Sequence, residues 1–260
     1  RAVVIGGGFL GLEAAEGLRT RGMDVTVLHR SGHLLNRQLN PIAGDILKQK
    51  LQQRGVSIRT GTSPVSLLGR NQVRAVELSD GTVLATDLVV IATGIEPNKG
   101  LAADAGLNCD RGIRVTPNLM TSNPHIYALG ECCQFQEHTF GLVEPGYEQA
   151  RILAQLLCQV PGARTFEPGE VATRLKISDL PIFSCGRVVP GEQTEIVEWQ
   201  DRTHAVYDQL LLDGNRLAGA ILLGDTANGP WYSELIRSGA DVSRYRDTIA
   251  FGKTYCDAAA

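Results

Sequence analysis

Residues 3–18 read VVIGGGFLGLEAAEGL and contain the strongest local signals in the N-terminal part of the chain. Its apolar run ends at Ile5, three glycines follow, and residues 12–21 are rich in Ala, Glu and Leu. Such a sequence predicts a strand, a tight turn and a helix. Residues 24–29 are rich in β-branched side chains and predict a second strand, so we expect a strand–helix–strand unit.

Gly6, Gly8 and Gly11 match the spacing G-x-G-x-x-G directly after the first predicted strand. In this context Gly6 permits the tight turn, Gly8 lets the backbone approach a pyrophosphate, and Gly11 lets helix and strand pack closely. The helix start would offer unpaired N–H groups to the phosphates. The pattern therefore predicts a dinucleotide site that includes Phe9 and Leu10, and the alternative is a glycine-rich turn without a ligand.

The end of the second strand bears on the choice of nucleotide. An acid there binds the ribose 2′-hydroxyl of NADH, whereas an Arg can accept the 2′-phosphate of NADPH. The strand ends Leu28-His29-Arg30, with no acid, so His29 and Arg30 are candidate ribose-side residues and NADPH is slightly favoured. Arg37 joins them only if the intervening loop folds back, and a solvated Arg30 is the alternative. Glu13 either favours the helix start or lies near the nicotinamide carboxamide.

The same signals divide the rest of the chain. An Asp80-Gly81 step between alternating segments predicts a hairpin, and the apolar run over residues 88–94 predicts a buried parallel strand that ends in glycine. From Val171 onward the pattern is that of an antiparallel α+β domain. The further predicted elements are a helix over 41–54, short strands within 56–86, strands at 112–115 and 126–130, a helix over 146–159, strands at 173–178, 194–201, 204–214 and 216–225, and a helix over 231–238.

Two local features of the C-terminal part have alternative interpretations. Trp231-Tyr232 is either an interface anchor, because such aromatics are enriched in interfaces, or a pair of core aromatics at a helix start. Asp225 is expected to cap the turn that follows it. We assign this part of the chain to packing and to association with a partner or a second copy.

Composition excludes several classes of protein. The chain has 260 residues, a net charge of −3 and no basic run, which argues against nucleic-acid binding. Its apolar runs are too short to span a bilayer, and no signal peptide is visible, so we expect a cytoplasmic protein. The six cysteines are scattered without C-x-x-C spacing, so no metal ligands are predicted and reduced thiols are expected.

Three segments in this order, VVIGGGFLGLEAAEGL, VVIATGIEPN and IYALGECCQF, resemble the pyridine nucleotide–disulfide reductase family of flavoproteins. The resemblance implies an FAD domain interrupted by an inserted NAD(P)H domain. Thr93 and Gly94 would close the NAD(P)H domain, and the Gly130-Glu131 corner would return to FAD, with Glu131 where most members have Asp. The FAD fingerprint lies further upstream in that family, so we expect this chain to be the latter part of a longer protein.

A narrower resemblance rests on YALGEC, FGLVEPGYEQARILA and LAGAILLGDT. These segments resemble the flavoprotein portion of the large subunit of assimilatory NAD(P)H nitrite reductase. Electron-transfer subunits of assimilatory nitrate reductase and rubredoxin reductases share parts of the pattern. By this likeness Leu142, Val143 and Pro145 would pass beside the isoalloxazine of FAD, with Tyr147 and Glu148 opening the following helix.

The predicted architecture is α/β, a Rossmann-like dinucleotide-binding domain followed by a smaller α+β C-terminal domain. Residues 1–97 would bind NAD(P)H, 98–160 would form the C-terminal part of an FAD-binding domain, and 161–260 would form an interface domain. The likeness implies an FAD-dependent oxidoreductase module that takes hydride from NAD(P)H and passes electrons to an acceptor domain or a small redox protein.

Alternatives to a nitrite reductase module are a nitrate reductase electron-transfer subunit, a rubredoxin or ferredoxin reductase, and a flavin-free NAD(P)-binding fragment. An iron–sulfur or sirohaem acceptor would lie in parts not present here. No general acid or base is predicted in this chain, because the nicotinamide and flavin carry the bond making. No membrane or nucleic-acid partner is expected, and homo-oligomer formation is left open.

Overall fold

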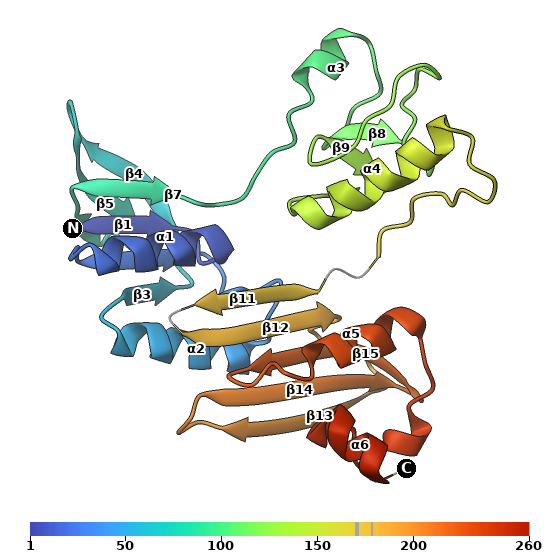
Figure 1. The fold of residues 1–260 in the computed structure, drawn as a ribbon. Coiled ribbons are helices and arrows are strands. Elements are labelled where there is room, and N and C mark those ends of the chain that lie inside the picture. The colour runs from blue at the N-terminus through green and yellow to red at the C-terminus, as the bar shows by residue number, and fades with distance from the viewer. Residues whose placement is uncertain (170–171, 178, 260) are drawn as a thin grey trace. The chain divides into compact units, whose positions relative to one another are not determined.

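The computed structural model describes residues 1–169, 172–177 and 179–259 (Figure 1). The chain forms two compact units, one of Arg1–Gly94 with Ala172–Ala260 and one of Ile95–Val171. Val171 and Ser178, at the expected start of the C-terminal domain and the expected end of its first strand, lie outside the described residues. Because residues 1–94 and 172–260 form one unit, the C-terminal segment belongs to the same compact unit as the N-terminal glycine motif.

A parallel sheet with strand order β3-β2-β1-β7 lies at the centre of the N-terminal segment. Apolar residues alternate along β1, so Ala2 and Val4 face a helical layer while Val3 and Ile5 face a small antiparallel sheet. The predicted α/β class is confirmed. The elements are β1 Ala2–Ile5, α1 Phe9–Thr20, β2 Val25–His29, α2 Pro41–Gln53, β3 Ser57–Thr60, β4 Pro64–Gly69, β5 Val73–Leu78, β6 Val83–Ala85 and β7 Leu88–Ile91.

The strand predicted over residues 88–94 is shorter and less buried than expected. Strand β7 covers only Leu88–Ile91 and lies at the edge of the sheet, paired with β1 alone. Leu88 is 37% exposed and Ile91 64% exposed. The apolar run gave no sign of its edge position, because strand order depends on topology and not on local sequence. The hairpin at Asp80-Gly81 is confirmed as the turn between β5 and β6.

The C-terminal segment forms a five-stranded antiparallel sheet with order β11-β12-β15-β14-β13. Strand β12 was not predicted, because Pro181 and Gly186 within LPIFSCG are poor strand formers. Asp225 accepts a hydrogen bond from the Ala227 N–H at 2.9 Å, which confirms its role in the following turn. The elements are β11 Thr173–Ile177, β12 Leu180–Gly186, β13 Thr194–Asp201, β14 Val206–Asp213, β15 Arg216–Leu223, α5 Gly229–Ser238, η1 Ser243–Tyr245, η2 Ile249–Phe251 and α6 Lys253–Ala259.

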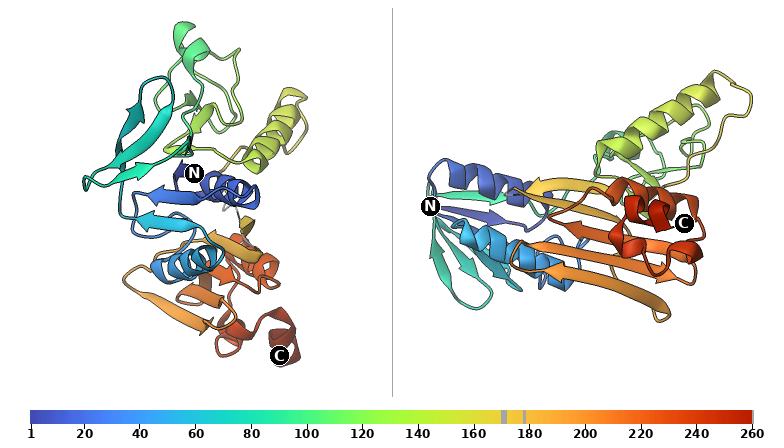
Figure 2. Two further views of the ribbon diagram at one scale, coloured as in Figure 1. Left: turned by 90° about the vertical axis from the view of Figure 1, so that its left-hand side faces the viewer. Right: turned by 60° about the horizontal axis from the view of Figure 1, so that its bottom comes forward.

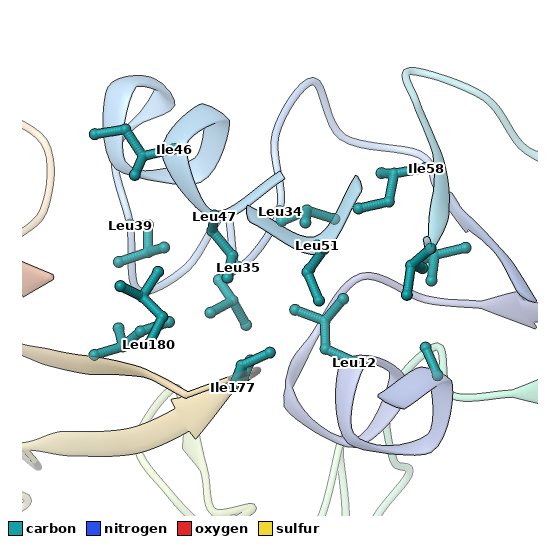
Figure 3. Close-up of a cluster of buried hydrophobic side chains, with 14 of the residues drawn as sticks. Leu12, Leu34, Leu35, Leu39, Ile46, Leu47, Leu51, Ile58, Ile177 and Leu180 are labelled. Atoms are coloured by element: carbon teal, nitrogen blue, oxygen red, sulfur yellow. The ribbon is translucent and has the colours of Figure 1, made fainter. Parts of the chain in front are cut away.

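The C-terminal sheet shares a hydrophobic core with the N-terminal helices (Figure 3). Leu35, Leu39 and Leu47, from α2 and the loop before it, are at most 1% exposed and pack in one cluster with Ile177 and Leu180 of β11 and β12. The cluster contains residues of both segments, in agreement with their place in one compact unit.

Helix α5 and the short helices after it cover the other face of the same sheet (Figure 2). Tyr232 is 1% exposed, clusters with Phe183 and Leu222, and donates its hydroxyl hydrogen to the Ile249 carbonyl at 2.7 Å. Trp231 packs against the same cluster. Tyr232 is therefore a core aromatic, whereas Trp231 is only partly buried against the same cluster.

The second unit contains a three-stranded sheet with order β10-β9-β8. The strand predicted at 126–130 is wrong, because this extended segment makes only an isolated bridge between Tyr127 and Met120. Helix α4 begins at Val143, three residues before the predicted start. The elements are α3 Gly100–Asp104, β8 Ile113–Val115, β9 Cys133–Phe135, β10 His138–Thr139 and α4 Val143–Leu157. Across the described residues of both units, every helix is too short or too polar to cross a membrane.

Candidate functional site

The glycine motif joins β1 to α1, and at Gly6 and Gly11 the backbone contacts are too close for a side chain. Gly6 has a φ of +124°, and a Cβ placed there would lie 2.2 Å from the Ala92 carbonyl oxygen. A Cβ on Gly11 would lie 1.9 Å from the Gly6 carbonyl oxygen. The loop, the start of α1 and the end of β7 are therefore in direct backbone contact, as the motif predicts for Gly6 and Gly11.

Gly8 differs from the other two glycines, because a Cβ placed there would have no atom within 4 Å. Gly8 is also the N-cap of α1, and among the described residues no side chain accepts a hydrogen bond from the N–H groups of this helix end. The first turn therefore directs unpaired N–H groups and a partial positive charge into open space. This combination fits a pyrophosphate. Phe9 is partly buried against the core, while Leu10 is 68% exposed beside the open space.

The segment after β2 folds back onto the glycine loop. The Leu35 N–H donates to the Gly7 carbonyl at 3.0 Å, and the Gly7 N–H donates to His29 Nδ1 at 3.1 Å. The loop between β2 and Arg37 therefore folds back toward the glycine loop, which is the condition under which Arg37 could approach the site. Arg30 and Arg37 are exposed, and neither forms an ion pair with a residue that the structure describes.

Two other predicted residues lie at the same edge of the sheet. Thr93 and Gly94 are exposed and directly follow Ala92, whose carbonyl contacts Gly6. Gly94 has a φ of +123°, and a Cβ there would have no atom within 4 Å. The carboxyl ends of β1 and β7 thus meet where ligands bind in open α/β sheets. Glu13 is exposed on α1, and its two interpretations both remain open.

In the second unit, the Gly130-Glu131 corner is held by a residue that we did not predict. Gly130 has a φ of +83°, and its N–H donates to Gln149 Oε1 at 2.6 Å. Gln149 is 0% exposed, and its Nε2 has no hydrogen-bond partner among the described residues. Only its position on the inner face of the following helix distinguishes it in the sequence. The Glu131 carboxylate beside this corner is exposed.

The two adjacent cysteines at the corner are both free thiols. Cys133 is buried and donates its S–H to the Gly130 carbonyl oxygen at 3.2 Å. Burial, with the neighbouring Cys132 as a second cause, raises the pKa of Cys133 to about 11. A thiol with such a pKa stays protonated at neutral pH and is a poor nucleophile. Cys133 therefore packs against the corner and hydrogen-bonds its backbone.

The start of α4 lies against the same corner. A Cβ on Gly146 would lie 3.7 Å from the Gly130 Cα. The N-cap Leu142 makes no side-chain capping bond, and Leu142 and Val143 are 43% and 62% exposed. An exposed carboxylate, a positive-φ glycine and an uncapped helix start fit part of an FAD site. Pro145 lies within the first turn of α4, where its missing N–H costs no helical hydrogen bond.

Two other residues near this helix start differ from the expectation. Tyr147 and Glu148 do not open α4, because the helix has already begun at Val143. Tyr147 is 67% exposed. Glu148 forms an ion pair with Arg164 at 2.7 Å and so fastens α4 to the segment that follows it.

Comparison with known proteins adds family evidence to this geometry. The family model "Pyridine nucleotide-disulphide oxidoreductase" matches residues 1–152, and the model "Rubredoxin NAD+ reductase C-terminal domain" matches residues 172–240. The nitrite reductase [NAD(P)H] of Bacillus subtilis is 39% identical over 94% of this chain and 30% of its own length. The assimilatory nitrate reductase electron transfer subunit of the same organism is 37% identical over 94% of this chain and 31% of its own length.

A solved structure agrees with these relatives. The ferredoxin reductase for the CYP199A2 system of Rhodopseudomonas palustris superimposes with a TM-score of 0.84 and 26% identity, over 100% of this chain and 64% of its own. The chain spans only about a third of the length of the two curated relatives, which share 30% and 31% of their lengths with it. The pyridine nucleotide-disulphide oxidoreductase model covers more than half of the chain. The fold of the ferredoxin reductase matches the whole length of this chain. The chain belongs to the pyridine nucleotide-disulphide oxidoreductase family.

Proposed function

We propose that this chain is the electron-entry module of an assimilatory NAD(P)H nitrite reductase. It would carry the pyridine nucleotide site and the returning half of an FAD site. The observation that carries this proposal is the open space over Gly8 at the uncapped start of α1. The similarity to nitrite reductase [NAD(P)H] of Bacillus subtilis supports the choice of enzyme.

Each half-site has a distinct task in this proposal. The N–H groups of the first turn of α1 bind the pyrophosphate, and the Thr93-Gly94 turn lies at the same edge of the sheet. In the other unit, Glu131 and the start of α4 bind FAD, while Gln149 holds the Gly130 backbone in place. Bound FAD would supply the chemistry that accepts hydride from the nicotinamide and delivers electrons singly.

NADPH is the nucleotide that we propose. The segment at the end of β2 presents the exposed guanidinium groups of Arg30 and Arg37 and no carboxylate, and the loop that carries Arg37 folds back onto Gly7. A 2′-phosphate placed there would meet positive charge, whereas a ribose hydroxyl would lack an acidic acceptor.

A second candidate is a reductase for a small iron–sulfur protein. The match of residues 172–240 to the rubredoxin reductase C-terminal model favours it. Both candidates take electrons from the same nucleotide site, and they differ in the acceptor. Electron delivery to a covalently attached sirohaem or iron–sulfur domain supports nitrite reductase, and delivery to added rubredoxin or ferredoxin supports the second candidate.

The test uses the full-length protein reconstituted with FAD under anaerobic conditions. Addition of NADPH or NADH should bleach the flavin absorbance, faster with NADPH, and later addition of nitrite should restore the absorbance. Bleaching without recovery by nitrite, but with recovery by rubredoxin or ferredoxin, would select the second candidate. A flavin that neither nucleotide bleaches would overturn both.

A further inference from the structure

His29 contacts the glycine loop and not only the end of its own strand. Its Nδ1 accepts a hydrogen bond from the Gly7 N–H at 3.1 Å. The Gly7 carbonyl is bound at the same time by the Leu35 N–H at 3.0 Å. A Cβ on Gly7 would lie 2.8 Å from the His29 Cγ and 2.7 Å from the Leu34 Cδ2, so the ring packs directly on the glycine. The residue between Gly6 and Gly8 is therefore held by the segment that follows β2.

These contacts define the protonation state of the ring. A ring nitrogen that accepts a hydrogen bond carries no proton, so the proton of neutral His29 lies on Nε2. Nε2 lies 3.1 Å from Asn36 Oδ1, which is an acceptor for it. Both contacts are satisfied only by the neutral Nε2–H tautomer. Protonation of Nδ1 would set an N–H against the Gly7 N–H and break the contact.

The charges around the ring also favour the neutral form. Burial lowers the pKa of His29 below its usual value, and the electrostatic effects of His33 and Arg30 act in the same direction, while the hydrogen bonds to Asn36 and to the His33 backbone oppose it. Strand β3 presents the uncharged Thr60 at the paired position, and the first turn of α1 carries no acid. No carboxylate is among the groups that act on this ring within the described chain.

We propose that His29 is a positioning residue for the pyridine nucleotide, which in its neutral form holds Gly7 and hence the Gly6–Gly11 loop ready for the pyrophosphate. The inference rests on the proposed function, since it requires a nucleotide on this loop. Acidification releases Gly7 and weakens binding. Simple attraction between an imidazolium and the phosphates predicts the opposite sign, so the direction of the pH effect decides between the two.

The test measures the dissociation constant of the nucleotide by nicotinamide fluorescence between about pH 5 and pH 8. Both NADH and NADPH are titrated, because the 2′-phosphate of NADPH itself changes charge at about pH 6. We call the rise of the dissociation constant at low pH the acid limb, and an acid limb that both nucleotides show belongs to the protein. The wild-type chain should show a constant dissociation constant above neutrality that rises on acidification, by at most about tenfold for each pH unit, as one linked proton requires.

Four variants separate the roles of the neighbouring side chains. His29→Asn places a non-titrating acceptor near the Nδ1 position, so it should bind within a few-fold of wild type at the alkaline end and lose the acid limb. His29→Leu should bind weakly at every pH. Asn36→Asp raises the pKa of His29 and should move the acid limb to higher pH. His33→Gln is the matched control, because His33 bonds the Leu39 carbonyl and not Gly7, and it should keep the acid limb.

The possible failures are distinguishable. No binding of either nucleotide by the wild type at any pH would overturn the proposed function together with this inference. Binding that tightens on acidification, or an acid limb that persists in His29→Asn, would overturn the inference alone. If His29→Leu does not fold, the comparison of His29→Asn with His33→Gln still decides.

Discussion

The glycines of the N-terminal loop differ in the space available for the methyl group of an alanine at each position. The Cβ of an alanine at position 11 would overlap the Gly6 carbonyl oxygen at 1.9 Å, whereas one at position 8 would have no atom within 4 Å. The same motif therefore contains two glycines needed for folding, Gly6 and Gly11, and one available for ligand approach, Gly8. The sequence alone assigned these roles by analogy, and the contacts give each a physical cause.

Two substitutions separate folding from binding in this loop. Gly11→Ala should lower the free energy of unfolding by about 1–3 kcal/mol, as overpacking does. Gly8→Ala should cost less, at most about 1 kcal/mol, because no atom obstructs the methyl group but alanine is a poorer N-cap than glycine. Gly8→Ala should instead weaken nucleotide binding by about tenfold or more, or about 1.4 kcal/mol, because the methyl group keeps the pyrophosphate from the backbone. Chemical denaturation and fluorescence titration measure the two effects, and unchanged affinity in Gly8→Ala would contradict the assignment.

Asp208 on β14 is a partly buried acid without a partner for its Oδ1 among the described residues. Burial, with the Asp225 charge as a second cause, raises its pKa from 3.8 to about 7. Between these two values the folded chain holds a proton that the unfolded chain has lost, so stability falls as the pH rises and levels off near neutrality. Asp208→Asn removes this contribution. The melting temperature of Asp208→Asn should fall less than that of the wild type from about pH 5 to pH 8. Equal dependence of the two melting temperatures on pH would contradict the raised pKa of Asp208.

At the scale of elements, the start of α2 is joined to the C-terminal sheet. Asn40 Oδ1 accepts from the Ala43 N–H at 2.8 Å, and Asn40 Nδ2 donates to the Tyr207 hydroxyl at 2.6 Å. The Tyr207 hydroxyl donates in turn to Glu198 Oε2 at 3.1 Å. One amide thus caps a helix and connects it to a strand that lies 167 residues away in the chain.

Two substitutions at Asn40 divide these contributions. Asn40→Ala should lower the free energy of unfolding by about 2 kcal/mol, about 1 from the cap and about 1 from the bond to Tyr207. Asn40→Ser keeps a capping oxygen but is too short to reach Tyr207, so it should recover only the capping part. Urea denaturation measures both. Equal stability of the serine and alanine variants would show that the cap contributes nothing.

The elements that could be predicted from the sequence are those with strong local signals. Asn40, Pro41 and Gly55 bound α2, and the glycine motif bounds β1 and α1. The strand at 126–130 was wrong because an apolar run does not reveal whether a neighbour exists to pair with it. The start of α4 was placed late because Pro145 and Gly146 resemble a boundary, although Pro is tolerated in the first turn.

The candidate site was predictable to the same degree. The glycine spacing pointed to the loop that we propose binds the pyrophosphate, and the resemblance pointed to the Gly130-Glu131 corner that we propose binds FAD. The roles of His29 and Gln149 were not visible in the sequence, because each depends on a contact with a distant residue. His29 lies 22 positions from Gly7, and Gln149 lies 19 positions from Gly130. Only the fold brings His29 to Gly7 and Gln149 to Gly130.

At the scale of the molecule, the C-terminal sheet and the N-terminal helices share one core. Leu47 of α2 is 0% exposed within the cluster that contains Leu180, Ile182 and Tyr207. A sequence read from one end to the other gave no indication of this packing, since it joins segments that are separated by the whole second unit. The two segments are therefore expected to unfold together.

Tryptophan fluorescence tests this coupling, because both tryptophans, Trp199 and Trp231, lie in the C-terminal segment. Leu47→Ala in α2 should lower the free energy of unfolding by about 2–5 kcal/mol, the usual cost of a buried leucine. The fluorescence midpoint should shift with it, although the mutation lies in the N-terminal segment. Gln49→Ala, at an exposed position of the same helix, should change stability by less than about 0.5 kcal/mol. An unshifted fluorescence midpoint in Leu47→Ala would contradict a shared core.

A map of nucleotide contacts on the backbone amides tests directly whether the glycine loop is the pyridine nucleotide site. The ¹H–¹⁵N spectrum of the isotope-labelled chain would be recorded during titration with NADPH. The largest shifts are expected at the amides of Gly8, Phe9 and Leu10, and a further shift is expected at Gly7 through its bond to His29. Shifts centred on another part of the chain, or none at saturating nucleotide, would contradict a pyridine nucleotide site at this loop.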